Sequence, residues 1–395
     1  MHNFSFRTLL FFLALIVMYP FAGRALDNGL ARTPPMGWNS WNKFACDGLN
    51  EKVIRDTADQ IASNGMEEAG YQYVNLDDCW QISRDAQGNI VVDASKFPSG
   101  IKALADYVHA KGLKLGIYTD AGTKTCAGRP GSMGHEYQDA KQYAEWGVDY
   151  VKVDWCNTLP GQGAESSYTL FRNAIAASGR PMVFSICEWG SNKPWLWAGP
   201  VGNLWRATDD IQDCWDCKKP WGGVGVVQIL DLMDGLQTYS GPGHWNDPDM
   251  LEVGNGGMTT DEDRAHFSMW ALFSAPLLVG TDLTKMSAET KETLLNRDVI
   301  AIDQDPAGFQ GHRVKKDGDL EVWSKQLADG GRAVVLLNRS AATAPISVAW
   351  TDIGYPNSIS ANVRDLWSKK NFPSQKGSYS AQVPSHAAVM ITVMP

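Results

Sequence analysis

Eight short strand-like runs alternate with helical patterns between residue 36 and about residue 285, and this alternation constrains the fold most. Most of these runs are apolar, and most intervals between them have the spacing of an amphipathic helix. Strands separated by helices pair in parallel, because each helix returns the chain to the same edge of the sheet. The predicted strands are 36–38, 73–76, 115–118, 150–153, 183–186, 204–206, 244–246 and 276–279.

Eight such units predict an α/β fold of the closed type, a (β/α)8 TIM barrel. One of the helices is clear from its apolar face, formed by Ile101, Leu104, Ala105 and Val108. A doubly wound open sheet is the alternative, but it usually carries the glycine-rich turn G-x-G-x-x-G after its first strand. That motif is absent here, so we predict the barrel.

The pattern changes after Asp303, where the helical period disappears. Short strand-like runs separated by Gly, Asp, Asn, Ser and Pro predict an antiparallel β-sandwich. We therefore expect a signal peptide at 1–25, a catalytic barrel at 26–305 and a C-terminal sandwich at 306–395. The predicted sandwich strands are 321–323, 333–337, 346–350, 361–366 and 388–393.

The first 25 residues have the pattern of a secretory signal peptide. Arg7 precedes an apolar run at 9–19, and a small-x-small site, Gly23-Arg24-Ala25, follows it. An uncleaved anchor is the weaker interpretation, because the run is short for a membrane span. We expect cleavage after Ala25 and a secreted or periplasmic protein.

The cysteine pattern agrees with export, since disulfides persist in oxidising compartments. Neighbouring parallel strands bring the loops that follow them together, so we predict the disulfides Cys46–Cys79 and Cys126–Cys156. Cys214 and Cys217 form one C-x-x-C in a loop, which leaves a local disulfide open. A zinc site would need more ligands, so we expect no metal and no cofactor.

The charge and the aromatic content of the chain limit the kinds of ligand and partner that it can bind. The net charge of -9 argues against nucleic acid, because phosphate binding needs a surplus of Lys and Arg. No later segment is long and apolar enough to anchor the chain in a membrane. The 16 tryptophans exceed what a core requires, and sugar rings pack their C–H faces on such aromatic planes.

In a barrel of this type, the active site forms at the C-terminal ends of the strands. The residues at those ends are mainly carboxylates with aromatic side chains, one lysine and one arginine, which suits a neutral polyhydroxylated ligand. They are Trp41, Asp77, Asp78, Tyr118, Lys152, Asp154, Cys187, Glu188, Trp189, Arg206, Asp210, Asp247 and Asp249.

Glycosidic cleavage needs two carboxyl groups, one on each side of the anomeric carbon. Strand alternation puts Lys152 and Asp154 on the same side, where the cation would keep the carboxylate ionised as a nucleophile requires. A structural ion pair is the alternative. Asp209 and Asp210 follow the sixth strand, and either could be the acid or merely a helix N-cap.

Asp77 and Asp78 would accept hydrogen bonds from sugar hydroxyls. A calcium or magnesium site that includes Asp247 and Asp249 is the alternative, and we rank it lower because no EF-hand spacing is present.

Six motifs at these strand ends, in this order, closely resemble the glycoside hydrolase family 27 α-galactosidases (melibiases), especially plant and bacterial members. The resemblance runs from about Leu30 to the C-terminus and includes the barrel-plus-sandwich layout. The motifs are Met36-Gly-Trp-Asn-Ser-Trp41, Asn75-Leu-Asp-Asp-Cys-Trp80, Tyr150-Val-Lys-Val-Asp-Trp-Cys156, Cys187-Glu-Trp-Gly190, Arg206-Ala-Thr-Asp-Asp210 and Trp245-Asn-Asp-Pro-Asp-Met250.

The resemblance implies a retaining exo-glycosidase that releases terminal α-D-galactosyl residues from oligosaccharides, galactomannan or galactoconjugates by double displacement. Asp154 would be the nucleophile and Asp210 the acid/base, which resolves the choice between Asp209 and Asp210. Glu188 would favour galactose over N-acetylgalactosamine. The other implied sugar-binding residues are Trp41, Asp77, Asp78, Tyr118, Lys152, Cys187, Trp189, Arg206, Asp249 and Met250.

Three alternatives stay open, and one of them is an inverting hydrolase on the same barrel, which would need widely spaced carboxylates. A β-L-arabinopyranosidase on the same scaffold would act on a sugar that lacks the C6 hydroxymethyl group of galactose. A non-catalytic galactose-binding protein would have no need for both Asp154 and Asp210. The segment 213–221 departs from the family pattern beside the acid/base, so it bears on aglycone preference. Asn338-Arg-Ser340 is a glycosylation sequon.

Overall fold

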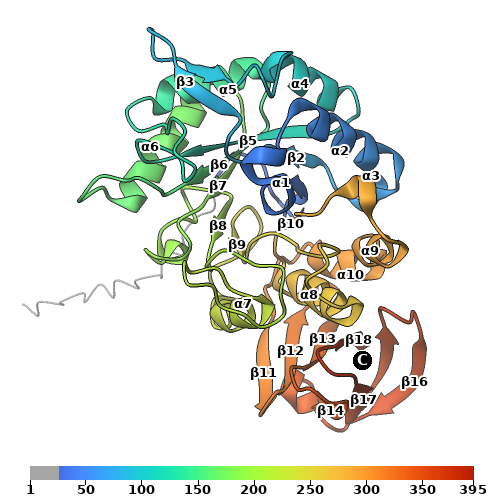
Figure 1. Ribbon diagram of the computed structural model, residues 1–395. Helices are drawn as coiled ribbons and strands as arrows, with labels where there is room; N and C mark the ends of the chain where they lie inside the picture. The colour runs from blue at the N-terminus through green and yellow to red at the C-terminus, as the bar shows by residue number, and fades with distance from the viewer. Residues whose placement is uncertain (1–25) are drawn as a thin grey trace, which may run out of the picture.

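The computed structural model describes residues 26–395 (Figure 1), and the signal peptide predicted for 1–25 lies outside them. All eight predicted barrel strands are present and pair in parallel with their neighbours, in the order β10-β1-β2-β5-β6-β7-β8-β9. Leu251, just after β9, closes the ring by pairing with Val279. The strands are β1 Met36–Asn39, β2 Tyr73–Asn75, β5 Lys114–Asp120, β6 Tyr150–Asp154, β7 Val183–Ile186, β8 Leu204–Arg206, β9 Trp245–Asp247 and β10 Leu277–Val279.

Helices surround the strands, and most of them have a buried apolar face, although α1 has no buried residue. The predicted face of α4, from Ile101 to Val108, is buried. A 3-10 turn, η1 Pro194–Leu196, stands where a helix would join β7 to β8. The helices are α1 Trp41–Gly48, α2 Glu51–Ser63, α3 Met66–Ala69, α4 Gly100–His109, α5 Glu136–Trp146, α6 Ala164–Ala177, α7 Val226–Met233, α8 Thr260–Phe273, α9 Ala288–Leu294 and α10 Arg297–Asp303. No helix in 26–395 is long and apolar enough to cross a membrane.

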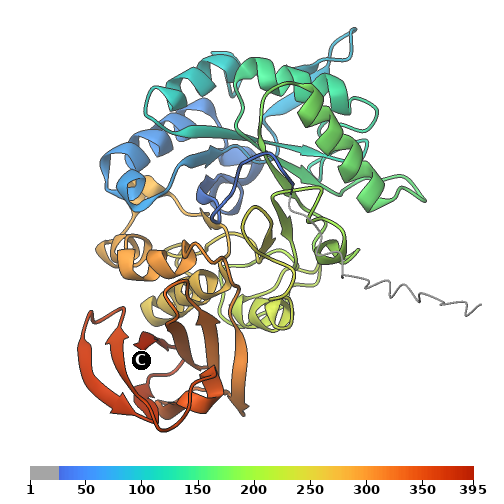
Figure 2. The same ribbon diagram turned by 180° about the vertical axis from the view of Figure 1, so that it is seen from behind.

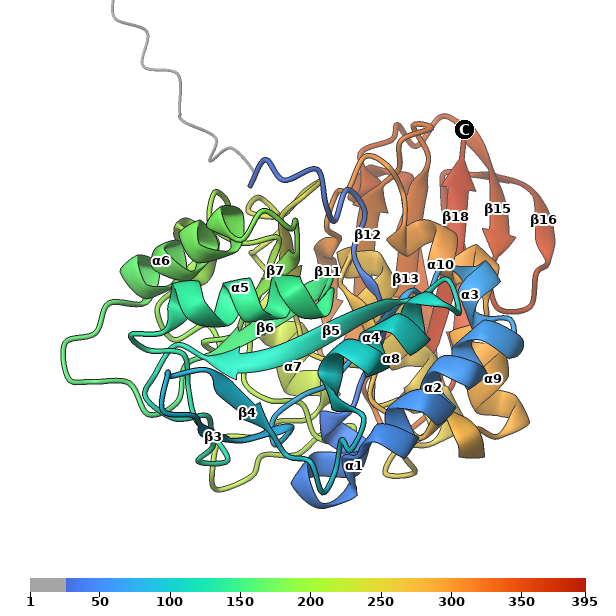
Figure 3. The ribbon, with the colours of Figure 1, turned by 90° about the horizontal axis from the view of Figure 1, so that it is seen from above.

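A hairpin that the sequence did not predict follows β2. It consists of β3 Gln81–Arg84 and β4 Ile90–Val92, joined by a turn in which Asp85 accepts backbone hydrogen bonds from Gln87 and Asn89. Figure 3 shows the hairpin and α1 together at one edge of the barrel. Both follow the C-terminal end of a strand, so they border the catalytic end of the barrel.

The C-terminal part is the predicted sandwich. Its larger sheet has the order β11-β12-β13-β18-β15-β16, and β14 pairs with β17 across from it. Three strands of this part were not predicted, namely β11, β16 and β17. Strands β11 and β16 are the edges of the larger sheet and are mostly exposed, so they lack an apolar alternation. The strands are β11 His312–Asp317, β12 Leu320–Gln326, β13 Arg332–Asn338, β14 Ala344–Ala349, β15 Ser360–Asp365, β16 Asn371–Lys376, β17 Ser378–Val383 and β18 Ala388–Met394.

The larger sheet packs on α8, as the views from both sides show (Figures 1 and 2). Alternate residues of β13 serve two cores: Val335 and Leu337 belong to the barrel core, whereas Val334 and Leu336 belong to the sandwich core. The barrel therefore rests on a sheet that is buried on both faces.

Candidate active site

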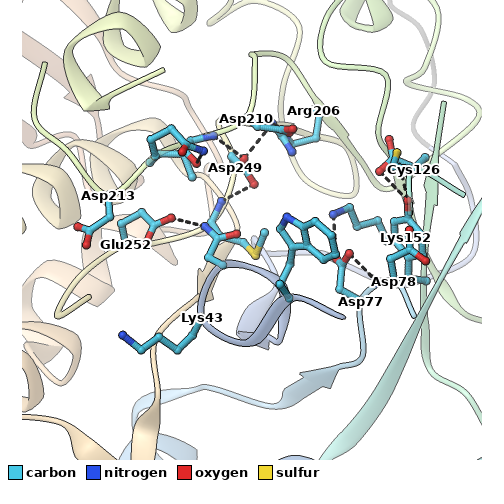
Figure 4. A pocket seen from close by; sticks show the side chains of 18 of the residues that line it. Lys43, Asp77, Asp78, Cys126, Lys152, Arg206, Asp210, Asp213, Asp249 and Glu252 are labelled. Atoms are coloured by element: carbon cyan, nitrogen blue, oxygen red, sulfur yellow. Dashed lines mark hydrogen bonds and ion pairs between the residues drawn. The ribbon is translucent and has the colours of Figure 1, made fainter. Parts of the chain in front are cut away.

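A cavity of about 580 Å³ opens at the C-terminal ends of the barrel strands (Figure 4). Polar side chains from most of the strand ends converge on it, as expected for a barrel of this type. The predicted site residues on its wall are Trp41, Asp77, Asp78, Tyr118, Lys152, Asp154, Trp189, Arg206, Asp210, Asp249 and Met250.

Asp154 is the last residue of β6, and two hydrogen bonds hold its carboxyl group. The Tyr118 hydroxyl donates to Oδ2 at 3.0 Å, and the backbone N–H of Trp155 donates to Oδ1 at 3.0 Å. Burial raises the pKa of Asp154 to about 6, while the charge of Lys152 acts in the opposite direction and that of Asp210 adds to the rise. Asp154 is thus oriented, and it is ionised at neutral pH.

Lys152 forms its ion pair with Asp77, not with Asp154 as the strand alternation suggested. Its Nζ lies 2.9 Å from Asp77 Oδ2, which also accepts a hydrogen bond from Asn39 at 2.9 Å. The lysine side chain is long enough to reach the end of β2, where the Asp77 carboxylate is only 3% exposed. Lys152 therefore acts on Asp154 through charge, and it fixes one wall of the cavity.

Asp78 lies beside this pair and links two loops. Its Oδ1 accepts from the backbone N–H of Cys79 at 2.7 Å, and its Oδ2 accepts from Ala127 at 2.9 Å. Burial raises the pKa of Asp78, and the backbone donors partly offset that rise. Asp77 and Asp78 together present acceptor oxygens to the same part of the cavity.

Arg206 organises the opposite wall. Its guanidinium contacts Asp210 Oδ1 at 2.9 Å and Asp249 Oδ2 at 2.9 Å, and Figure 4 shows the three side chains together. The backbone N–H of Ile211 also donates to Asp249 Oδ2 at 2.9 Å. Asp249 is buried, so this network anchors the segment that carries Asp210.

The two candidate catalytic carboxyl groups have unlike surroundings. Asp154 is 6% exposed, whereas the side chain of Asp210 is 42% exposed. Asp209 is exposed and does not line the cavity. The structure thus brings Asp210, rather than its neighbour, to the same cavity as Asp154.

Three predicted residues, Asp247, Cys187 and Glu188, are not on the cavity wall. Cys187 is buried behind it, 3.8 Å from a nitrogen of Arg206. Glu188 is fully buried, and its carboxylate accepts from the backbone and side-chain nitrogens of Asn192 at 2.6 and 2.8 Å. The Glu188 side chain stabilises the turn after β7, and the adjacent Trp189 reaches the cavity, while the contact of Glu188 with the sugar stays a prediction.

Several cavity residues were not predicted, because they lie beyond the strand ends. Glu252 is buried among Asn42 and Asn255, and burial raises its pKa to about 8. The signal for Glu252 and Asn255 is their proximity to the β9 motif, which the sequence prediction ended at Met250, whereas the others follow β1, β5 and β8. Asp213 and Trp221 belong to the segment 213–221, which the sequence placed beside the acid/base. The unpredicted lining residues are Asn42, Lys43, Ala45, Cys126, Ile211, Gln212, Glu252 and Asn255.

Disulfides brace the loops around the cavity. Both predicted bonds, Cys46–Cys79 and Cys126–Cys156, are present, and Cys214 and Cys217 also form a disulfide. Cys187 is the free cysteine of the described residues.

The carboxylates of the metal alternative do not form a cluster. Asp77 pairs with Lys152, and Asp249 pairs with Arg206. One other group within 26–395 has the proximity of metal ligands, namely Asp120, Cys126, Asp154 and Cys156. Its two cysteines are joined in a disulfide and have no thiolate to offer, so the donor set does not suit a metal.

The barrel and the sandwich each match a known family model. Residues 33–305 match the model described as α-galactosidase A, and residues 317–393 match the α-galactosidase C-terminal β-sandwich domain. The chain belongs to the α-galactosidase family of glycoside hydrolases. Every motif on the cavity wall falls within the first match.

Relatives from a plant and a bacterium show the same similarity over nearly the full length. The chain is 52% identical to an α-galactosidase of Cyamopsis tetragonoloba, over 93% of this chain and 88% of that protein. It is 51% identical to α-galactosidase A of Cellvibrio japonicus, over 93% of each. The crystal structure of α-galactosidase I from Mortierella vinacea superposes with a TM-score of 0.91 at 39% identity, over 93% of this chain and 98% of that one.

A more distant neighbour is relevant to the arabinopyranosidase alternative. It is a β-L-arabinopyranosidase of Geobacillus stearothermophilus, with a TM-score of 0.82 at 26% identity, over 92% of this chain and 97% of that one. The scaffold is shared, but the sequence similarity to the α-galactosidases is much greater.

Proposed function

We propose that this enzyme is a retaining exo-α-galactosidase in which Asp154 is the nucleophile and Asp210 the acid/base. The observation that carries the proposal is the pair of carboxyl groups on one cavity, one buried and hydrogen-bonded, the other partly open to solvent. A retaining glycosidase needs these two environments, because one carboxylate attacks carbon and the other exchanges protons with the leaving group and with water.

In the first step, an oxygen of Asp154 forms a bond to the anomeric carbon as the bond to the leaving oxygen breaks. Asp210 gives its proton to that leaving oxygen, and Arg206, 2.9 Å away, stabilises the carboxylate that remains. In the second step, Asp210 takes a proton from water, the water oxygen bonds to the anomeric carbon, and Asp154 is released.

Sugar recognition falls to the rest of the wall. Asp77 and Asp78 would accept hydrogen bonds from the axial O4 and the O6 hydroxyl, and Lys152 would donate to O3 and O4. Arg206 would donate hydrogen bonds on the O2/O3 side of the sugar. Trp41 would pack against the C–H face of the ring, with Tyr118, Trp189, Asp249 and Met250 completing the pocket.

The compartment and the division of the chain belong to the same proposal. Three disulfides in the described part support action outside the reducing cytosol. The interval between α10, which ends at Asp303, and β11, which begins at His312, supports a domain boundary near residue 305. Asn338 is buried and its Nδ2 donates to three backbone carbonyls, so this sequon is not a glycosylation site of the folded protein.

Hydrolysis of p-nitrophenyl α-D-galactopyranoside and of melibiose by variants tests the roles. We expect Asp154→Asn to lose both activities by more than about 10⁴-fold. Asp210→Asn should lose melibiose hydrolysis by about 10²–10⁴-fold but retain more of the aryl substrate, whose leaving group needs little protonation.

Asp209→Asn is the matched control, because Asp209 is the adjacent, exposed carboxylate, and it should keep both activities. A wild type that prefers p-nitrophenyl β-L-arabinopyranoside would establish the arabinopyranosidase alternative. A wild type that binds galactose and hydrolyses neither substrate would establish the binding protein.

A further inference from the structure

Trp221 is unusual among the tryptophans of the chain because it is 63% exposed. It nevertheless belongs to the wall of the catalytic cavity, together with Gln212, Asp213 and Lys43. None of these residues is in the group around Asp77, Asp78 and Lys152, and Figure 4 shows Lys43 and Asp213 on the other side of the cavity from that group. An indole left in solvent beside a binding cavity offers a flat apolar surface to a ligand.

The backbone holds Trp221 in a defined position. Lys219, Pro220, Trp221 and Gly222 form a turn, in which the N–H of Gly222 donates to the carbonyl of Lys219 at 3.0 Å. Proline at the second position suits this turn. The N–H of Lys219 donates in turn to the carbonyl of Gly223 at 2.7 Å, which closes a small hairpin.

This hairpin is attached directly to the catalytic segment. The N–H of Val224 donates to the backbone carbonyl of Asp210 at 2.9 Å, and the N–H of Gln212 donates to the carbonyl of Val224 at 2.8 Å. At its base, Gly225 donates to Cys217, one half of the Cys214–Cys217 disulfide. Trp221 is thus fixed relative to the proposed acid/base, where the leaving group departs.

Because Gly223 has no side chain, it leaves the space in which the Trp221 indole lies. A Cβ at this position would come within 2.5 Å of the Trp221 ring, and within 3.0 Å of the Gln212 side chain. Only glycine allows the ring to pack this closely on the hairpin. One part of the indole therefore contacts the backbone, and the rest of its surface is open.

We propose that Trp221 is the stacking platform for a sugar ring attached directly to the galactosyl residue, so that the enzyme prefers galacto-oligosaccharides over galactosides with small leaving groups. This inference rests on the proposed function. Lys43 and Asp213 bring opposite charges to the same mouth, which suits a neutral aglycone. Their polar groups, with Gln212 and Asn255, also suit hydroxyl groups better than a lipid chain.

The test compares raffinose with methyl α-D-galactopyranoside in the wild type and in Trp221→Ala. Both substrates release an unactivated primary alcohol oxygen, but only raffinose has a ring that can reach Trp221. We expect Trp221→Ala to lower kcat/KM for raffinose by about tenfold, mainly through KM, because stacking acts on bound substrate and transition state alike. The value for the methyl galactoside should change less than twofold.

Two control variants complete the design. Trp221→Phe keeps an aromatic face and should recover most of the raffinose activity. Leu196→Ala removes another side chain that is 61% exposed but does not line the cavity, and it should leave both substrates unchanged. Equal losses on both substrates, or no loss on raffinose, would contradict the role of Trp221 as a stacking platform. A wild type inactive on both substrates would instead overturn the proposed function.

Discussion

At the scale of single residues, the chemistry depends on how the protein controls the ionisation of Asp154. Burial of this carboxyl favours its neutral form, and the charge of Lys152 opposes that effect. Lys152 is itself held by Asp77 at 2.9 Å, so its charge stays beside the nucleophile without covering it. In the proposed mechanism, the ion pair would therefore serve both sugar binding and catalysis.

The pH dependence follows from the raised pKa of Asp154, which is about 6. Below that value the carboxyl is protonated and cannot attack, so kcat/KM should fall as the pH falls through about 6. The Tyr118 hydroxyl stabilises the ionised form through its 3.0 Å hydrogen bond to Oδ2. Tyr118→Phe should therefore move the acid limb of the kcat/KM profile to higher pH by about one unit.

The measurement is kcat/KM for an aryl α-galactoside between pH 4 and 8 in both proteins. A profile that Tyr118→Phe leaves in place, or moves to lower pH, would show that Asp154 does not govern the acid limb.

The family resemblance of the motifs points to Asp154 and Asp210 as the catalytic candidates, but the motifs do not predict which side chains these carboxyl groups contact. The expected Lys152–Asp154 pair is replaced by Lys152–Asp77, because a long side chain can reach a neighbouring strand end. The place of Glu188 in a motif predicts a sugar ligand, but it does not predict the turn after β7, in which the Glu188 carboxylate accepts from Asn192. Side-chain direction depends on such local turns.

At the scale of elements, the segment between β8 and α7 connects the active site to the sandwich. The carbonyls of Cys214 and Trp215 accept from the first N–H groups of α7, at Val226 and Val227. The Trp215 ring stacks on His386 of the sandwich with 5.6 Å between ring centroids. His386 in turn lies 2.7 Å from Glu262 of α8. The sandwich thus supports the loop that follows Asp210.

Removing this support should affect proton transfer. We expect His386→Ala to lower kcat by about tenfold for methyl α-galactoside and raffinose alike, because both need a well-placed acid. The aryl galactoside should lose less. His312→Ala is the matched control, since His312 is exposed on the edge strand β11. A loss confined to raffinose, or equal on all three substrates, would contradict a positioning role.

The elements themselves were predictable where apolar residues recur with a regular period. All eight barrel strands have that signal, as does the buried face of α4. The β3–β4 hairpin and the edge strands β11 and β16 lack it, because their side chains are largely exposed and their pairing depends on backbone hydrogen bonds.

At the scale of the whole molecule, the contact between barrel and sandwich was the least predictable feature. Lys325 lies in β12, yet it is buried and donates to Ser274 Oγ at 2.6 Å, and burial lowers its pKa to about 8. Its acceptors come from α8, α10 and the residue after α8, which are distant in sequence. A lysine in a strand predicts that this face of the strand is exposed to solvent, unless the domain that packs on the strand is known.

The same interface explains how the sandwich contributes to the site. Its sheet continues the barrel core through Val335 and Leu337, and its His386 reaches the loop after Asp210. The molecule is best described as one catalytic barrel that is supported on its α8 side by the larger sheet of the sandwich. One face of that sheet belongs to the barrel core.

The central claim is that Asp154 forms a covalent bond to the sugar. The most direct test treats the wild type with 5-fluoro-α-D-galactosyl fluoride, digests it and maps the labelled peptide by mass spectrometry. The account predicts one fluorogalactosyl group, attached to Asp154. Attachment to another carboxylate, or turnover with inversion at the anomeric carbon and no adduct, would contradict it.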